Sequence, residues 1–191
     1  MSLETLLARV EKQVIDATAL VVASQPMYAF FELYVWPMPP TVSLGSRLWA
    51  IGATYAGVGF LVATCREWWK SRAGICSGKS ERKKWIHDMA YKAVFNAATQ
   101  PVTYVAVGLF TGGVALQDVI GGTAATTLVA FASGGYECYV LDTFRELWGI
   151  KPPERLPMCV QEKSSAQKKG IALTFSALSY LSLGLLYVGK T

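Results

Sequence analysis

The sequence predicts an all-α membrane protein, a polytopic bundle of five transmembrane helices. Hydrophobic residues make up 52% of the 191 residues and charged residues only 16%, whereas about a quarter of an average soluble protein is charged. Most of the Lys and Arg residues are gathered in two blocks that separate long apolar stretches. This composition excludes a disordered chain and a typical soluble enzyme, and it indicates several membrane spans.

Five stretches are long and apolar enough to cross a bilayer, which takes about 20 residues. They comprise residues 14–34, 46–65, 89–112, 119–141 and 171–188. The segment before the first stretch is predicted to be an amphipathic helix, because its apolar residues recur at helical spacing on one face: Leu3, Leu6, Leu7, Val10 and Val14. The chain therefore divides into an interfacial helix at 1–13, a four-helix membrane domain at 14–149, an inner loop at 150–170 and a fifth transmembrane helix at 171–191.

The distribution of Lys and Arg predicts the orientation of the chain. Arg9 and Lys12 precede the first stretch, seven basic residues lie at 66–84 and six lie at 145–169. The connections after the first and third stretches hold no Lys or Arg. Because basic residues accumulate on the cytoplasmic side, we expect an inner, cytoplasmic-type membrane with the N-terminus inside and the C-terminus outside.

The same distribution bears on partners and on the cysteines. The formal net charge of +5 reflects topology, so we expect the lipid bilayer and no nucleic acid as a partner. The cysteines have no CxxC or zinc-site spacing. We expect all of them to be reduced thiols near the inner side; they are Cys65, Cys76, Cys138 and Cys159.

The first two stretches resemble the next two as an internal repeat. The first half carries Asp16, Gln25-Pro26 and Arg66-Glu67-Trp68-Trp69, and the second carries Asp88, Gln100-Pro101 and Arg145-Glu146-Leu147-Trp148. Since each half begins and ends inside, the two copies would be parallel and related by an axis along the membrane normal. The fifth stretch has no counterpart.

Polar residues follow one face of several predicted spans. One helical face of the third predicted span carries Asp88, Lys92, Asn96, Thr99, Gln100 and Thr103. A face of the first span carries Thr18, Gln25, Tyr28 and Glu32, and a face of the fourth carries Thr123, Thr126, Thr127, Ser133 and Glu137. Such faces can line a hydrophilic path. For a single Thr, a hydrogen bond between packed helices is the stronger expectation.

The two Gln-Pro pairs lie near the predicted membrane midplane. Each proline lacks an N–H and releases the carbonyl four residues earlier, at Val22 and at Ala97. Amide side chains and released carbonyls are the parts from which a small polar solute site is built. The alternative is a packing kink whose carbonyl is bonded by Ser24 or Thr99. The second span, with Gly52, Ala53, Ala56, Gly57 and Gly59, is expected to pack closely.

Several charged residues are expected to pair within the bundle. Glu32 and Arg47 should pair near the outer ends of the first two spans. Glu137 could carry a proton or pair with Arg145 or Arg66. Asp142 and Arg145, at i and i+3, suggest a helix-end ion pair. We assign Asp16, Asp88, Asp142 and Arg145 to ion pairing or proton coupling.

These residues, taken in order, resemble the bacterial L-alanine exporter (AlaE) family. The first half carries Asp16-Ala-Thr-Ala-Leu-Val-Val, Glu32, Ser46-Arg47-Leu48 and Ala50-Ile51; the second carries Gln100-Pro101-Val102, Tyr104-Val105-Ala106, Tyr136, Leu141-Asp142 and Arg145. The resemblance covers residues 13–149 and implies a four-span inner-membrane protein that exports L-alanine and related amino acids with the proton gradient. This chain departs from the family in its fifth span, its longer inner loop and its shortened Gln-[Ser/Thr]-Pro motif.

We therefore expect an exporter of L-alanine or a related small amino acid. Its pathway residues would be Gln25, Glu32, Arg47, Asn96, Gln100 and Glu137, with the solute carboxylate towards Arg47 and the ammonium towards Glu32 or Glu137. The alternative is an accessory subunit of a larger membrane complex, for which the extra helix and the Trp-rich inner boundary would serve as packing faces and anchors. A homo-oligomer fits either function. No nucleophile–base or metal-ligand pattern is present in the sequence, so no enzyme, cofactor or metal is expected.

Overall fold

The computed structural model describes residues 2–75, 80–113 and 115–189, and this part of the chain is 86% helical with no strand. The predicted all-α class is confirmed. Cys76 and Lys79 lie outside the described residues. The helices are α1 (Leu3–Phe30) with a π-helical extension η1 (Phe31–Val35), α2 (Pro40–Ala53), η2 (Thr54–Val58), α3 (Gly59–Arg72), α4 (Glu81–Thr111), α5 (Leu116–Leu147), a short α6 (Met158–Gln161) and α7 (Ser165–Val188).

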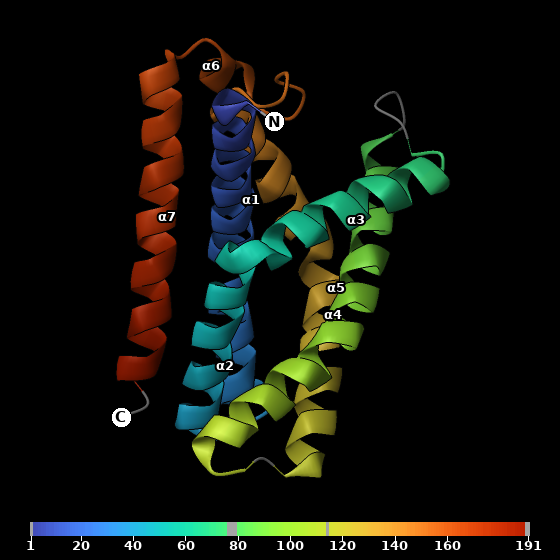
Figure 1. The fold of residues 1–191 in the computed structure, drawn as a ribbon, viewed down its shortest axis with the longest axis vertical. Helices are drawn as coiled ribbons and strands as arrows, with labels where there is room; N and C mark the ends of the chain where they lie inside the picture. Colours follow the sequence, from blue (N-terminus) through green and yellow to red (C-terminus); the bar gives the residue numbers. More distant parts are fainter. Residues whose placement is uncertain (1, 76–79, 114, 190–191) are drawn as a thin grey trace.

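The long helices alternate in direction along one axis (Figure 1). The start of α1, the end of α3, the start of α4 and α6 lie at one end, which we call the basic end because it carries the Lys- and Arg-rich segments. The start of α2, the connection from α4 to α5 and the end of α7 lie at the opposite, far end. The basic segments therefore share one end of the bundle.

Four helical segments of the described chain are long and apolar enough to cross a membrane: Leu3–Val35, Pro40–Arg72, Glu81–Phe110 and Ser165–Val188. They include four of the five predicted spans. The remaining one, 119–141, lies within α5, which is long but rich in Gly and Thr. Helix α5 has buried residues along most of its length, so other helices surround much of it.

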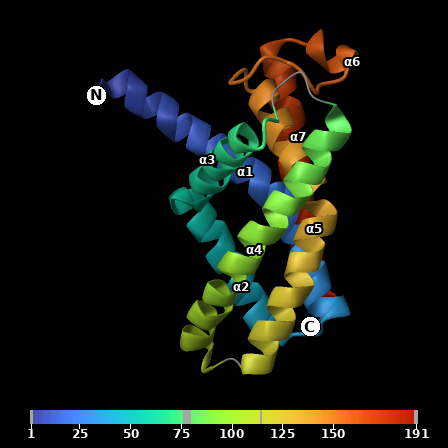
Figure 2. The ribbon, with the colours of Figure 1, turned by 90° about the vertical axis from the view of Figure 1, so that its right-hand side faces the viewer.

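The first and last helices occupy very different positions in the bundle. In α1, 67% of the most apolar window is buried, against 6% in α7. Helix α1 is therefore central and α7 peripheral. The first turns of α1 are exposed and project away from the other helices (Figure 2). They continue into the bundle without a break, so the predicted interfacial segment at 1–13 and the first span form one helix.

The second predicted span, 46–65, is broken in the structure. Gly57 has φ +135°, a conformation that L side chains rarely adopt, and α3 leaves α2 at a steep angle there (Figure 1). The expected close packing of this span is wrong for Gly52 and Gly57, whose Cβ positions face open space. Gly59 does pack closely, because a Cβ there would lie 3.1 Å from the Ala17 Cα.

Both prolines of the Gln-Pro pairs lie inside helices, Pro26 in α1 and Pro101 in α4. The carbonyl that Pro26 releases, at Val22, accepts a 2.7 Å hydrogen bond from Ser179 Oγ of α7. Ser24 and Thr99 instead bond the carbonyls of Leu20 and Phe95 in their own helices. The proline in α1 thus supplies a docking point for the last helix.

Candidate functional site

A cavity of about 350 Å³ lies between α1, the broken α2–α3 pair and α4. We call it the central cavity. Its polar lining includes four of the six predicted pathway residues, namely Gln25, Arg47, Asn96 and Gln100; Glu32 and Glu137 do not line it. Tyr28 and Lys92 complete the polar part of the lining. Much of the remaining lining is apolar, with Leu20, Val62 and Phe95 among it. The structure therefore brings the glutamines of both Gln-Pro pairs to one cavity.

Two amide atoms on this cavity have no hydrogen-bond partner among the described residues. Gln100 Nε2 donates to Asn96 Oδ1 over 3.1 Å, which leaves Gln100 Oε1 and Asn96 Nδ2 buried and unpartnered. A buried polar atom without a partner is costly. Both side chains line the cavity, but these two atoms are themselves buried, so a small polar occupant would bond them only after the amide groups turn.

At the far-end side of the cavity, Glu32 is the centre of a buried network. Arg47 Nη2 lies 2.7 Å from Glu32 Oε1, and both side chains are buried, so the predicted pair is confirmed. Tyr104 Oη and Ser43 Oγ also donate to Glu32, over 2.6 and 2.8 Å. Arg47 Nη1 reaches Gln25 Oε1 at 3.3 Å, which links this network to the cavity.

Glu137 pairs with Lys92, and not with Arg145 or Arg66, the two partners that were considered as one alternative to a proton-carrying role. The Lys92 Nζ to Glu137 Oε2 distance is 2.6 Å, and Tyr28 and Ser133 donate to Glu137 Oε1. The reason is the close approach of α4 and α5: a Cβ at Gly134 would lie 2.7 Å from the Lys92 Cβ. Glu32 and Glu137, the two carboxylates expected to attract the ammonium group of a solute, are therefore already bonded to side chains of the protein.

At the basic end, Arg66 is completely buried and joins three helices. It donates to Asp88 of α4 through Nε and Nη2, at 2.9 and 2.6 Å. It also donates to Asp142 of α5 through Nη1 and Nη2, at 3.1 and 3.0 Å. Arg66 was grouped with the basic residues at 66–84 that follow the second apolar stretch. It lies in α3, which the bend at Gly57 turns towards α4.

Arg145 pairs with Asp16 of α1, at 2.6 Å from Nε and 2.8 Å from Nη2. The predicted i, i+3 pair of Asp142 with Arg145 is therefore wrong, because each has a bidentate partner on another helix. The acid of each predicted repeat thus pairs with the arginine of the other: Asp16 with Arg145, and Asp88 with Arg66.

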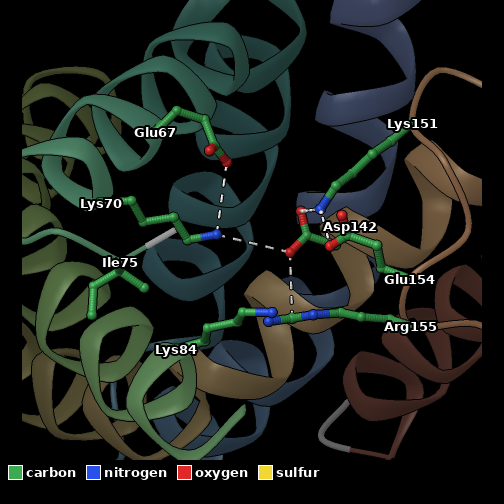
Figure 3. A pocket seen from close by; sticks show the side chains of 8 residues that line it. All are labelled: Glu67, Lys70, Ile75, Lys84, Asp142, Lys151, Glu154 and Arg155. Atoms are coloured by element: carbon green, nitrogen blue, oxygen red, sulfur yellow. Dashed lines mark ion pairs between the residues drawn. The ribbon is translucent and has the colours of Figure 1, made fainter. Parts of the chain in front are cut away.

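Further cations surround Asp142 at a smaller cavity of about 190 Å³, which we call the basic-end pocket (Figure 3). Lys70, Lys151 and Arg155 point towards Asp142, with nitrogen–oxygen distances of 4.0, 3.9 and 3.3 Å. Glu146 accepts the backbone N–H groups of Arg155 and Leu156, at 2.9–3.0 Å. This contact fixes the segment after α5 so that Arg155 reaches Asp142.

Tyr104, Ser43 and Arg155 were given no role from the sequence, and Arg66 was considered only as a partner of Glu137. Tyr104 lies four residues after Gln100 and so continues the polar face of that span, a signal that could have found it. Arg155 lies in an irregular segment, and no periodicity indicated its contact. Within the described chain, no group of three His, Cys, Asp or Glu side chains could hold a metal ion.

Fold and site together define a class of protein, a helical membrane bundle whose central cavity has a partly polar lining and lies between two buried ion-pair networks. Comparison with known proteins adds no family to this description: no family model, curated protein or solved structure matches the chain.

Proposed function

We propose that this protein is a membrane exporter of a small zwitterionic amino acid such as L-alanine. The observation that carries the proposal is the central cavity, with its free donor on Asn96 and free acceptor on Gln100. The charges beside it are balanced, Arg47 by Glu32 and Lys92 by Glu137. A cavity beside which the charges are balanced favours a neutral or zwitterionic solute over an ion, because an ion would leave a net buried charge.

The crosswise ion pairs support the further proposal of two parallel repeats. A two-fold axis along the membrane normal exchanges the two halves. If an acid of the first half pairs with an arginine of the second, the equivalent acid of the second half must therefore pair with the equivalent arginine of the first. The Asp16–Arg145 and Asp88–Arg66 pairs have this reciprocal relation. In this proposal α5 is also a crossing, the fourth of five along the chain, and the basic end faces the inside. Rocking of the halves alternates access, driven by the proton gradient.

Replacement of Gln100 by leucine tests the proposal. Cells that take up an alanine-containing dipeptide accumulate alanine, and expression of an exporter should protect them. Gln100→Leu removes the amide but keeps a similar volume, and leucine is well tolerated in a bilayer core. We expect the variant to insert and purify normally and to lose protection, since one or two lost hydrogen bonds to a charged ligand cost about 1.5–3 kcal/mol each.

The matched control is Val105→Leu, on the same helix but on an exposed position, which should retain protection. If the wild-type chain gives no protection when well expressed, the exporter proposal fails. If Gln100→Leu protects as well as the wild type, Gln100 joins helices and does not bind solute.

An accessory subunit of a larger membrane complex is the second candidate. Helix α7 favours it, because this apolar helix is held mainly along one side of α1 and has only Ala172 and Ser176 buried. Native mass spectrometry of the tagged protein from its own membranes tests it. Fixed-stoichiometry association with other proteins supports the subunit, and a monomer or homo-oligomer supports the exporter.

A further inference from the structure

The central cavity and the basic-end pocket lie on opposite sides of one buried ion pair. The central cavity is lined by Val62 of α3 and Lys92 of α4, and the basic-end pocket by Lys70 of α3 and Lys84 of α4. Residues four apart lie on the same face of a helix, one turn from each other. Arg66 is four residues from both Val62 and Lys70, and Asp88 is four residues from both Lys84 and Lys92.

Arg66 and Asp88 fill the space between the cavities. Both residues are fully buried, their side chains form two hydrogen bonds of 2.9 and 2.6 Å, and neither lines either cavity. Asp142 closes the third side, through its two bonds to Arg66. Along both α3 and α4, the ion pair therefore lies one helical turn from a residue that lines the central cavity and one turn from a residue that lines the basic-end pocket.

We propose that the Arg66–Asp88 pair is the gate between the central cavity and the basic-end pocket, and that this pocket is the vestibule through which a zwitterionic solute reaches the gate. The vestibule carries both signs of charge, with Lys70, Lys151 and Arg155 around Asp142 and with Glu67 and Glu154 beside them (Figure 3). A zwitterion presents both signs as well, so each end of the solute finds a counter-charge there.

The vestibule also provides counter-charges that Asp142 would need when the gate opens. When Arg66 moves away from Asp142, that carboxylate keeps three other cations within 4.0 Å. Breaking a buried pair is costly chiefly because it leaves an uncompensated charge. Lys70, Lys151 and Arg155 reduce this cost on the Asp142 side. The proposal rests on the exporter function for its solute, but the gate itself is tested independently of transport.

Cysteine labelling provides that test. Asn96→Cys places a single thiol at the central cavity, in a chain whose four native cysteines are changed to alanine. A membrane-impermeant maleimide is applied to each side of sealed vesicles, and the labelling rate is followed by mass. The gate variant is Arg66→Ala with Asp88→Ala, which removes both charges and opens space between the cavities.

The matched control is Asp16→Ala with Arg145→Ala. This removes the other bidentate pair at the same end, and Arg145 lines neither cavity. We expect labelling from the basic-end side to accelerate at least about tenfold in the gate variant and to stay within about twofold of the parent in the control, since the rate follows the open population.

Equal rates in the parent and the gate variant would overturn the gate, and so would an equal acceleration in the control variant. If labelling responds as expected while the wild-type chain exports no amino acid, the gate stands and the exporter function fails. The two proposals can therefore fail separately.

Discussion

At the scale of single residues, the protein buries an unusual number of charges and pairs them across helices. Glu32, Asp16, Arg66 and Asp88 are each at most 2% exposed, and each has a partner within 3 Å. Buried ion pairs contribute little net stability, because desolvation offsets their attraction. Removal of one partner is costly, however, and the pairs therefore specify which helix faces meet.

Replacement of Arg47 by alanine should strongly destabilise the protein. Glu32 would keep its bonds from Tyr104 and Ser43 but lose its counter-charge, and such a loss costs about 3–5 kcal/mol. Thermal unfolding of the purified protein in detergent measures the effect. Lys12→Ala, at an exposed position on α1, is the control and should leave the unfolding temperature unchanged. Equal unfolding temperatures for the two variants would show that the Glu32–Arg47 pair does not stabilise the bundle.

At the scale of helices, the most extensive contact is that of α4 with α5, and Gly134 of α5 permits their close approach. A Cβ at Gly134 would lie 2.9 Å from the Asp88 carbonyl oxygen and 3.0 Å from the Met89 Cα. Without a side chain at this position, α4 approaches until Lys92 reaches Glu137. Close approach at small residues is a common way for membrane helices to associate.

Gly134→Ala should therefore push α4 and α5 apart. The added methyl group meets backbone atoms that cannot rotate away, and overpacking of this kind costs about 1–3 kcal/mol. Gly52→Ala is the matched control, because its Cβ faces open space in α2 and alanine is the better helix former. Unfolding temperatures in detergent should fall for Gly134→Ala and stay level or rise for Gly52→Ala. The same result for both variants would contradict the close α4–α5 contact.

At the scale of the whole molecule, the alternating helices place the basic segments at one end and the end of α7 at the other (Figure 1). This arrangement suits a membrane protein whose basic end faces the cytoplasm. The far end is closed by the Glu32 network and the basic end by the Arg66 and Arg145 pairs. The central cavity between them is the part of the molecule best placed to hold a solute.

Thiol labelling of intact cells tests the orientation. Thr41→Cys lies at the start of α2, at the far end, and is exposed, whereas native Cys159 is exposed in α6 at the basic end. An impermeant reagent applied outside should modify the introduced cysteine and miss Cys159, and inverted vesicles should give the reverse. Labelling of Cys159 in intact cells would overturn the predicted orientation.

Much of the fold could be predicted because the signals are local. Hydropathy and charge distribution locate the apolar helices and gather the basic segments at one end, and helical spacing identifies the polar faces that meet at the central cavity. The Glu32–Arg47 pair was also within reach, since the short connection at Trp36–Pro40 brings the adjoining ends of two neighbouring helices together.

The sequence by itself therefore determined the helical class, the positions of the apolar helices and the residues that face inwards. Only the tertiary structure decided which charges pair: Glu137 with Lys92, Asp142 with Arg66, and Arg145 with Asp16. Partner choice depends on how far each helix is rotated and shifted against its neighbours. In this bundle the bend at Gly57 and the close contact at Gly134 set those positions, and neither can be read from periodicity along a single helix.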